Sequence, residues 1–334
     1  MKRTQLATTP PARTGLENAS PPAPVDATIA GRPDTATVKA PIGFVGLGRI
    51  GGSMAARLLA AGWPVSGTAR GRDGAQALVD AGLRWCDTPR EIAEEADIIV
   101  TSLPDDGVLE AVASGPDGLL AGLSAPKVWA DMSTVSPSVS RRVAARVRAR
   151  GAAMLDTPVS GGVPQVRAGT LTIMAGGDEG AYRRVEPVLR ELGTPTRVGG
   201  NGQGLVLKLA LNISLAVQIV AFSEGVLLAE QDGVDRRLAA EVMAASAIGS
   251  PMLKARGPFV LALPDDAWFD VTLMHKHIRL ALATAGAAGV PLPTARVADR
   301  LLTRAHQLGY AHRDIAAVFE VLARLDAEPL SEAA

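Results

Sequence analysis

Residues 42–61, IGFVGLGRIGGSMAARLLAA, are the segment of this 334-residue chain that indicates its fold most clearly. Residues 42–45 form a short apolar run that predicts a buried strand, and residues 52–61 have helical spacing. The turn between them is the motif G-x-G-x-x-G, made of Gly46, Leu47, Gly48, Arg49, Ile50 and Gly51. In this context the three glycines permit the turn, the approach of a pyrophosphate and close packing of helix on strand. We therefore predict that residues 46–51 bind a dinucleotide at the helix N-terminus.

The end of the second predicted strand, near residues 65–69, bears on the choice of dinucleotide. An acidic residue at this point usually holds the ribose 2′-hydroxyl of NAD. Here the chain reads Thr68-Ala69-Arg70-Gly71-Arg72, and the first carboxylate is Asp73. Arg70, helped by Arg72 and Thr68, suits a 2′-phosphate through charge-assisted hydrogen bonds, unless both arginines are solvated loop charges. We predict NADP as the cofactor, with NAD possible.

Further apolar runs at residues 96–102, 127–131, 153–156 and 171–175 predict additional strands. Their alternation with helical segments predicts a mostly parallel sheet covered by helices, with ligands beyond the carboxyl ends of the strands. Leu103, Pro104 and Thr134 follow two of these strands. They are either ligand contacts or ordinary turn residues.

Residues 205–229 predict a long helix that is apolar almost all the way round, and we expect most of it to be buried. Lys208 lies on it, in a chain with six lysines and twenty-eight arginines, and Asn212 follows one turn later. A buried amine is expensive unless it is paired or its pKa falls, as happens in active sites. The alternative is an ion-paired or snorkelling core lysine. Since the helix also carries Gln218 and Glu224, we favour a buried soluble helix over a membrane span.

Composition excludes several classes of protein. Apolar residues make up 47% of the chain, and 34 basic residues balance 34 acidic ones, so nothing suggests a nucleic-acid or membrane partner. The single cysteine, Cys86, excludes an internal disulfide and favours a cytoplasmic location. Residues 1–40 are rich in Pro, Ala and Thr and lack the apolar segment of a secretory signal. We expect a disordered tail there rather than a transit peptide.

Blocks of sequence in a fixed order give this chain a specific resemblance. They are GFVGLGRIGGSMA (43–55), SLPDD (102–106), DMSTVSP (131–137), DTPVSGGVPQVRAGTLTIMAGG (156–177), GQGLVLKLALN (202–212) and HKHIRLAL (275–282). With them, residues 42–322 resemble the β-hydroxyacid dehydrogenases, which include 3-hydroxyisobutyrate dehydrogenase and tartronate semialdehyde reductase. The resemblance implies an NAD(P)-dependent oxidoreductase that interconverts a small 3-hydroxy acid and its semialdehyde.

The resemblance also implies roles for individual residues. Lys208 matches the family's catalytic lysine, a general acid and base, and Asn212 matches its substrate-contacting asparagine. Ser160, Gly161 and Gly162 match the loop that holds the substrate carboxylate. Leu103, Pro104, Thr134 and Lys276 match contacts to the cofactor. Arg70 occupies the slot of the arginine in Asn-Arg-Thr, which ends the second strand of relatives that use NADP.

The implied fold is α/β, with an N-terminal Rossmann-type dinucleotide-binding domain joined by a long helix to an all-α C-terminal domain. We place the first domain at residues 41–200, the helix and second domain at 201–326, and a short tail at 327–334. The resemblance further implies a homodimer or homotetramer.

The chain departs from the family at His277, where Lys276 is usually followed by aspartate. This change could alter how Lys276 is held or mark a different substrate. His275 and His277 point to different faces of a helix, so we expect no metal there. Two alternatives to a hydroxyacid dehydrogenase stay open. One is an imine reductase of the same superfamily, which generally lacks a lysine at position 208, and the other is a nucleotide-sensing protein without turnover.

Overall fold

The glycine turn lies between a strand and a helix, as predicted. The structure is a computed structural model that describes residues 39–325. Strand β1 (Ile42–Val45) is completely buried and leads directly into helix α1 (Arg49–Ala60). The helix therefore starts before the predicted position, Gly52, and its first turn already contains Arg49, Ile50 and Gly51.

Around β1 the described residues form a nine-stranded sheet in the order β3-β2-β1-β4-β5-β6-β8-β7, with β9 paired to β8. The strands after β1 are β2 (Val65–Thr68), β3 (Arg84–Trp85), β4 (Ile98–Thr101), β5 (Val128–Asp131), β6 (Ala153–Asp156), β7 (Val159–Ser160), β8 (Leu171–Gly176) and β9 (Gly193–Gly199). From β3 to β6 all neighbours are parallel. The carboxyl ends of β1, β4 and β5 therefore meet at one edge, next to the glycine turn.

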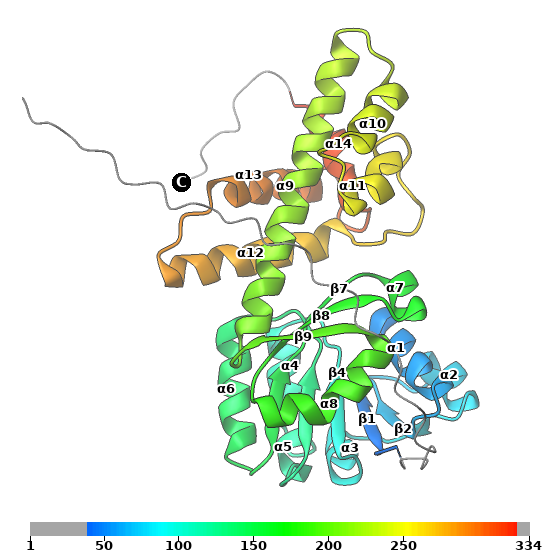
Figure 1. Cartoon of the computed structure of the whole chain (residues 1–334), viewed down its shortest axis with the longest axis vertical. Coiled ribbons are helices and arrows are strands. Elements are labelled where there is room, and N and C mark those ends of the chain that lie inside the picture. Colours follow the sequence, from blue (N-terminus) through cyan, green and yellow to red (C-terminus); the bar gives the residue numbers. More distant parts are fainter. Residues whose placement is uncertain (1–38, 326–334) are drawn as a thin grey trace, which may run out of the picture. The chain divides into compact units, whose positions relative to one another are not determined.

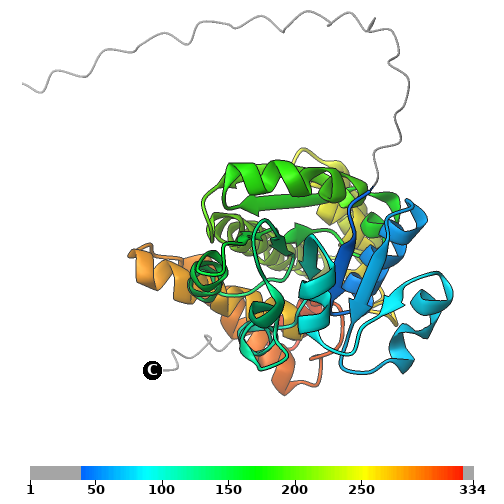
Figure 2. The same ribbon diagram turned by 90° about the horizontal axis from the view of Figure 1, so that it is seen from below.

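Helices cover both faces of this sheet (Figures 1 and 2). Besides α1, they are α2 (Gln76–Asp80), α3 (Pro89–Glu95), α4 (Asp106–Ser114), α5 (Leu119–Gly122), α6 (Pro137–Arg148), α7 (Val163–Ala168) and α8 (Glu179–Leu192). Because side chains alternate along a strand, each central strand contributes to two hydrophobic cores, one on each face of the sheet. Val128 and Ala130 pack with α1 and α8, whereas Trp129 packs with α3 to α6. Two buried faces explain why these strands are continuous apolar runs.

At the far edge of the sheet, β8 matches the strand predicted at residues 171–175, whereas β7, β9 and the antiparallel pairing were not predicted. β8 runs antiparallel to β6 and to β7 but parallel to β9. β7 has two residues, and β9 (GTPTRVG) contains two glycines and a proline, which strand patterns normally exclude. These segments become strands through pairing with β8 rather than through local propensity.

The remaining described residues are mainly helical, as Figure 1 shows. The helices are α9 (Gln203–Gln231), α10 (Arg236–Ala245), α11 (Pro251–Arg256), α12 (Val271–Ala288), α13 (Pro293–Gln307) and α14 (Val318–Leu322). One core joins α9 to α12, α13 and α14, and a second joins α9 to α10 and α11. The structure confirms the predicted fold class, which is a Rossmann-type domain joined by a long helix to an all-helical region.

Helix α9 is exposed to a greater extent than predicted. It is the helix among the described residues that is long and apolar enough to cross a membrane, yet only 44% of its most apolar window is buried. Val206, Leu207 and Leu211 are 39–40% exposed, and Leu228 is 75% exposed. The prediction that most of α9 is buried is therefore wrong, because helices α10 to α14 cover only part of its apolar surface.

Asp156 fixes the start of α9. It lies buried at the end of β6, where its Oδ1 accepts a hydrogen bond from the Gly202 amide at 2.6 Å and its Oδ2 accepts from the Leu205 amide at 3.0 Å. Burial raises the pKa of this carboxyl to about 7, although both amides oppose the shift. The sheet thereby holds the helix turn that precedes Lys208.

The two predicted tails lie almost entirely outside the described residues. Lys39 and Ala40 are the last residues of the predicted N-terminal tail, and they fall within the described part. The Lys39 ammonium lies 5.0 Å from the centre of the Trp63 ring. The domain boundaries at residues 200 and 326 stay predictions.

Candidate active site

The glycine turn has the backbone geometry that a bound phosphate requires. Gly46 has φ +97°, and an added Cβ there would lie 2.4 Å from the Ser102 oxygen. A Cβ at Gly51 would lie 2.0 Å from the Gly46 oxygen. By contrast, a Cβ at Gly48 would meet nothing within 4 Å. The first and third glycines are thus required by packing, and the second leaves the backbone open to a ligand.

The N-terminus of α1 is free to bind an anion. Gly48 is its N-cap, no side chain caps the first amides, and the first turn contains no acidic residue. Uncapped amides and the positive end of the helix dipole favour a phosphate group. The turn therefore fits the pyrophosphate of a dinucleotide.

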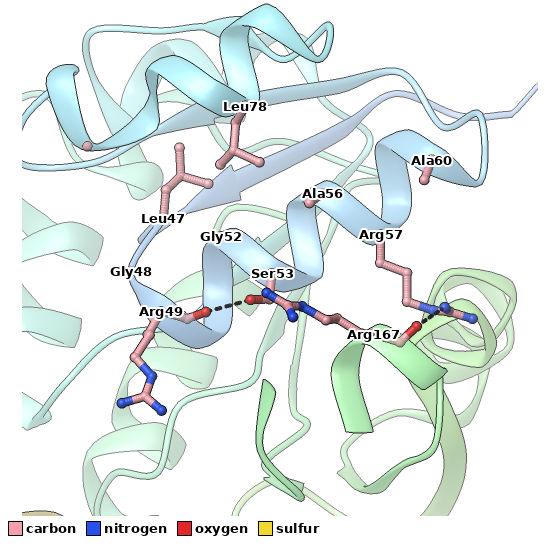
Figure 3. A pocket seen from close by; sticks show the side chains of 11 residues that line it. Leu47, Gly48, Arg49, Gly52, Ser53, Ala56, Arg57, Ala60, Leu78 and Arg167 are labelled. Atoms are coloured by element: carbon pink, nitrogen blue, oxygen red, sulfur yellow. Dashed lines mark hydrogen bonds between the residues drawn. The ribbon is translucent and has the colours of Figure 1, made fainter. Parts of the chain in front are cut away.

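A groove of about 700 Å³ begins at this turn and follows α1 (Figure 3). Its lining residues are Leu47, Gly48, Arg49, Gly52, Ser53, Ala56, Arg57, Ala60, Gly74, Leu78 and Arg167. It shares three residues with the predicted cofactor loop, but it contains neither Lys208 nor Arg70. The groove therefore coincides with part of the predicted cofactor loop and not with the predicted catalytic lysine.

Arg70 follows β2 and is exposed, as is Arg72. Neither guanidinium has a hydrogen-bond or ion-pair partner between residues 39 and 325. Thr68 is buried at the end of β2, and its carbonyl oxygen accepts a hydrogen bond from the Gly46 amide at 3.0 Å. The strand end is thereby attached to the glycine turn, and Arg70 is available for a phosphate beside it.

Lys276 joins the helical region to two loops of the sheet. Its ammonium donates to the Pro104 oxygen at 2.7 Å and to the Thr134 oxygen at 2.8 Å. Burial lowers the pKa of Lys276, while Asp105, Asp106 and Asp131 favour its charged form. The structure thus brings together three predicted cofactor contacts, Pro104, Thr134 and Lys276.

Asp131 organises the same loops from within the sheet. Its Oδ1 accepts hydrogen bonds from the hydroxyl groups of Thr101 at 2.7 Å and Ser133 at 2.5 Å. The Ser133 hydroxyl in turn accepts from the amide of Leu103 at 2.8 Å. Burial raises the pKa of Asp131, and these donors oppose that shift. The Leu103 and Thr134 loops are therefore held by one buried carboxyl.

Lys208 is buried on α9, with 8% of its surface exposed. Burial, together with the charge of Lys276, lowers the pKa of its amine from 10.5 to about 8. Within residues 39–325 the amine has no hydrogen-bond or ion-pair partner, and it is not among the polar atoms sealed from solvent. An ion-paired core lysine would show such a partner. Among the described residues the amine is instead unpaired, and it keeps some contact with solvent.

Asn212 lies one turn after Lys208 and is almost completely buried. Its Nδ2 lies 2.7 Å from Nδ1 of His277, which is also buried. The His277 ring packs against Phe269, with 5.4 Å between ring centres. This contact brings α9 and α12 together at the predicted substrate residue.

The Ser160 loop is held by neighbours of its own. β7 places Val159 and Ser160 beside β8, and the Gln165 side chain accepts a hydrogen bond from the Gly162 amide at 2.9 Å. Gly161 has φ +134°, and an added Cβ would lie 2.7 Å from Leu171. In the described part of the chain, no hydrogen bond joins this loop to Lys208 or Asn212, so their meeting at one substrate stays a prediction.

Comparisons with known families agree with this arrangement. Residues 41–201 match the family described as the NAD-binding domain of 6-phosphogluconate dehydrogenase. Residues 202–322 match the family described as the NAD-binding domain of NADP-dependent 3-hydroxyisobutyrate dehydrogenase.

Individual relatives are similar over most of the chain. 2-(Hydroxymethyl)glutarate dehydrogenase of Eubacterium barkeri is 33% identical over 84% of this chain and 94% of its own length. 2-Hydroxy-3-oxopropionate reductase of Escherichia coli is 34% identical over 84% of this chain and 96% of its own. The structure of 3-hydroxyisobutyrate dehydrogenase from Mycobacterium tuberculosis with L-serine has a TM-score of 0.78 and 30% identity, covering 86% and 100%.

An imine reductase from a Pseudomonas species shares the fold, with a TM-score of 0.57 and 24% identity over 85% of this chain and 99% of its own. At that identity the similarity concerns the fold alone.

A dinucleotide-binding domain with an all-helical partner, and relatives that act on hydroxy acids, define the class of protein. The chain is an NAD(P)-dependent oxidoreductase that acts on CH–OH groups. It belongs to the β-hydroxyacid dehydrogenase family.

Sequence reasoning missed two carboxyls and one contact. Asp131 and Asp156 each end a buried parallel strand, a position that could have singled them out. The hydrogen bond between Asn212 and His277 joins residues far apart in sequence, and no local pattern indicates it.

Proposed function

We propose that the chain interconverts a small 3-hydroxy acid and its semialdehyde, with NADP preferred and Lys208 as the general acid and base. The observation that carries this proposal is the amine of Lys208, which is buried and unpaired among the described residues and has a pKa near 8. A group that titrates near neutral pH can both give and accept a proton. A lysine with its ordinary pKa would hold its proton too firmly for this role.

Lys208 moves the proton of the reaction. In reduction its ammonium donates a proton to the carbonyl oxygen, and in oxidation the neutral amine accepts one from the hydroxyl group. The nicotinamide, when bound, supplies or takes up the hydride. Proton transfer by a positioned side chain contributes on the order of a hundred- to ten-thousandfold in rate.

Substrate binding is proposed for two groups of residues. Asn212, beside Lys208, contacts the hydroxyl of the substrate. Ser160 and the amide of Gly161 hold its carboxylate. Gly162, whose own amide already donates to Gln165, has no side chain to block the close approach of the anion. The relatives named above act on hydroxy acids or an oxo acid, which supports a small carboxylate as substrate.

Cofactor binding is proposed for the glycine turn and the loops beside it. The members are Gly46, Leu47, Gly48, Arg49, Ile50, Gly51, Arg70, Leu103, Pro104, Thr134 and Lys276. The open backbone at Gly48 supports the pyrophosphate position. The unpaired guanidinium of Arg70 at the end of β2 supports a preference for the 2′-phosphate of NADP.

We also propose a homodimer or homotetramer in the cytoplasm. The exposed apolar side chains of α9 and α10 support assembly, because large apolar surfaces on one chain indicate a protein interface. A single buried cysteine suits a reducing compartment.

A panel of substrates tests the proposal. Succinic, methylmalonic and tartronic semialdehydes, a set of 3-hydroxy acids and a cyclic imine are each offered with NADPH or NADH, or with the oxidised cofactors. Consumption or formation of the reduced nicotinamide is followed by absorbance. We expect turnover with at least one semialdehyde and preference for NADPH. Turnover of the imine alone would favour an imine reductase, and binding without turnover of any compound would favour a nucleotide sensor.

A further inference from the structure

His277 lies beside Asn212 in the candidate site but has no part in the proposed proton transfer. It lies on α12 with 5% of its surface exposed. Its Nδ1 lies 2.7 Å from the Asn212 amide nitrogen, and the Phe269 ring packs at 5.4 Å against its own ring. The imidazole is therefore fixed by a hydrogen bond on α9 and by an aromatic contact.

Burial and the charges around His277 keep its ring neutral. Burial, with the positive charges of Lys276 and Lys208, holds the pKa of His277 well below its ordinary value of 6.5. At neutral pH the ring therefore has one proton and one acceptor nitrogen. Because the Asn212 amide nitrogen can only donate, Nδ1 is assigned as the acceptor and Nε2 carries the proton.

We propose that His277 is a positioning residue, which orients Asn212 by accepting its amide hydrogen and keeps the wall beside Lys208 uncharged. This inference rests on the proposed roles of Lys208 and Asn212. With one Nδ2–H directed at the imidazole, the amide oxygen of Asn212 is left to face the substrate hydroxyl. The orientation of that amide is then set by α12 and not by α9 alone.

The same imidazole bears on the charge of Lys208. The charged group that acts on its pKa is Lys276, and no carboxylate does so. The carboxylates nearby, Asp105, Asp106 and Asp131, act on Lys276 instead. The imidazole of His277 already lies within the influence of the Lys208 charge, so a carboxylate at position 277 would favour the charged form of Lys208 and raise its pKa. The neutral imidazole thus preserves an amine that can release its proton near pH 8.

An NMR titration of the lysine side chains tests the charge argument without any substrate. The chain has six lysines, so a protein labelled with ¹³C-lysine gives a simple spectrum, and a Lys208→Arg variant assigns the signal of Lys208. We expect His277→Asp to raise the pKa of Lys208 by about one unit or more, and the neutral control His277→Asn to shift it by less than about half a unit. An unchanged pKa in His277→Asp would overturn the proposal.

A kinetic comparison tests the orientation of Asn212. His277→Asn retains an acceptor near the position of Nδ1, whereas His277→Leu removes it, and thermal unfolding checks that each variant is folded. We expect kcat/KM of His277→Leu to lie about tenfold below that of His277→Asn, with the difference vanishing when Asn212→Ala is added. Equal values for the two variants would overturn the positioning role, and this comparison decides alone if His277→Asp does not fold.

The two tests separate failure of this inference from failure of the proposed function. A chain without dehydrogenase activity would refute the proposed function, while the titration would still decide whether position 277 sets the charge of Lys208. A shifted titration with no turnover would support this inference and refute the proposed function. Turnover with an unshifted titration would support the proposed function and refute this inference.

Discussion

Lys208 is a cation placed where its charge is disfavoured, and the pH dependence of the enzyme should reveal this. Burial and Lys276 lower the pKa of the amine to about 8, so the acid form predominates below that pH and the base form above it. We predict that kcat/KM for semialdehyde reduction is constant below pH 8 and falls about tenfold per pH unit above it.

For oxidation of the hydroxy acid, kcat/KM should instead rise with pH and reach a plateau above pH 8, because this direction needs the neutral amine. Initial rates over a buffer series at saturating NADPH or NADP measure both profiles. A reduction profile that stays flat to about pH 10, near the ordinary pKa of lysine, would contradict the role of Lys208.

Arg70 should discriminate between the two cofactors. Its exposed guanidinium at the end of β2 has no partner among the described residues and is proposed to bind the 2′-phosphate. Because a hydrogen bond to a charged group contributes about 1.5–3 kcal/mol, Arg70→Ala should raise KM for NADPH roughly ten- to a hundredfold. Its effect on NADH should be small.

Steady-state kinetics with both cofactors measure this difference. Arg150→Ala serves as the control, because it removes an exposed arginine that is not among the predicted cofactor contacts. An equal rise in KM for NADPH and NADH in Arg70→Ala would contradict the assignment of Arg70 to the 2′-phosphate.

At the scale of secondary structure, the strands that sequence predicts are those buried on both faces. β1, β4, β5 and β6 are apolar runs for that reason, and all four were predicted within a few residues. β3, β7 and β9 were missed because they are short or interrupted by glycine and proline. Their structure depends on pairing with a neighbour, which no local pattern contains.

The element before α12 depends on a buried ion pair. Arg256 of α11 donates to both carboxylate oxygens of Asp314, and the backbone amides of Trp268 and Phe269 donate to Oδ2 at 3.0 and 3.2 Å. Asp314 is completely buried. It thereby connects α11 to the segment that leads into α12, the helix of Lys276 and His277.

Removal of that carboxylate should destabilise the fold. Asp314→Ala leaves the Arg256 charge buried without its partner, so we predict a loss of about 3–5 kcal/mol in the free energy of unfolding. Urea unfolding followed by circular dichroism measures it. Glu320→Ala is the control, since the exposed pair of Glu320 and Arg324 at 3.8 Å should contribute about 0–1 kcal/mol. Similar losses in the two variants would show that the Asp314 pair is not a structural centre.

Across the two regions of the chain, the local motifs could be predicted from sequence, whereas the tertiary contacts between them could not. The glycine turn and the lysine helix can be read from continuous sequence. The contacts of Lys276 with Pro104 and Thr134, and that of Asn212 with His277, join segments distant in the chain. Such contacts follow from the packing of α12 against α9 and the sheet loops, which is a property of tertiary structure.

The exposed apolar surface predicts how copies of the chain associate. Leu238 and Val242 lie one turn apart on α10 and are 53% and 59% exposed, and Leu228 on the adjoining helix is 75% exposed. We predict a dimer or tetramer in sedimentation velocity. The substitutions Leu238→Glu and Val242→Glu should shift the assembly towards monomer, because an apolar interface does not tolerate buried unpaired charges.

Arg150→Glu, an exposed substitution in the nucleotide-binding half, should leave the assembly unchanged. A monomeric unmodified chain at micromolar concentration would contradict the proposed assembly.

Turnover by Lys208→Ala tests the role of this lysine in proton transfer. We predict a folded protein that binds NADPH with unchanged affinity, while kcat for semialdehyde reduction falls by about a hundredfold or more. Cofactor binding is measured by fluorescence of the reduced nicotinamide, and kcat by its absorbance. A variant that binds NADPH normally and retains a kcat near that of the unmodified enzyme would contradict the proposal that Lys208 transfers the proton.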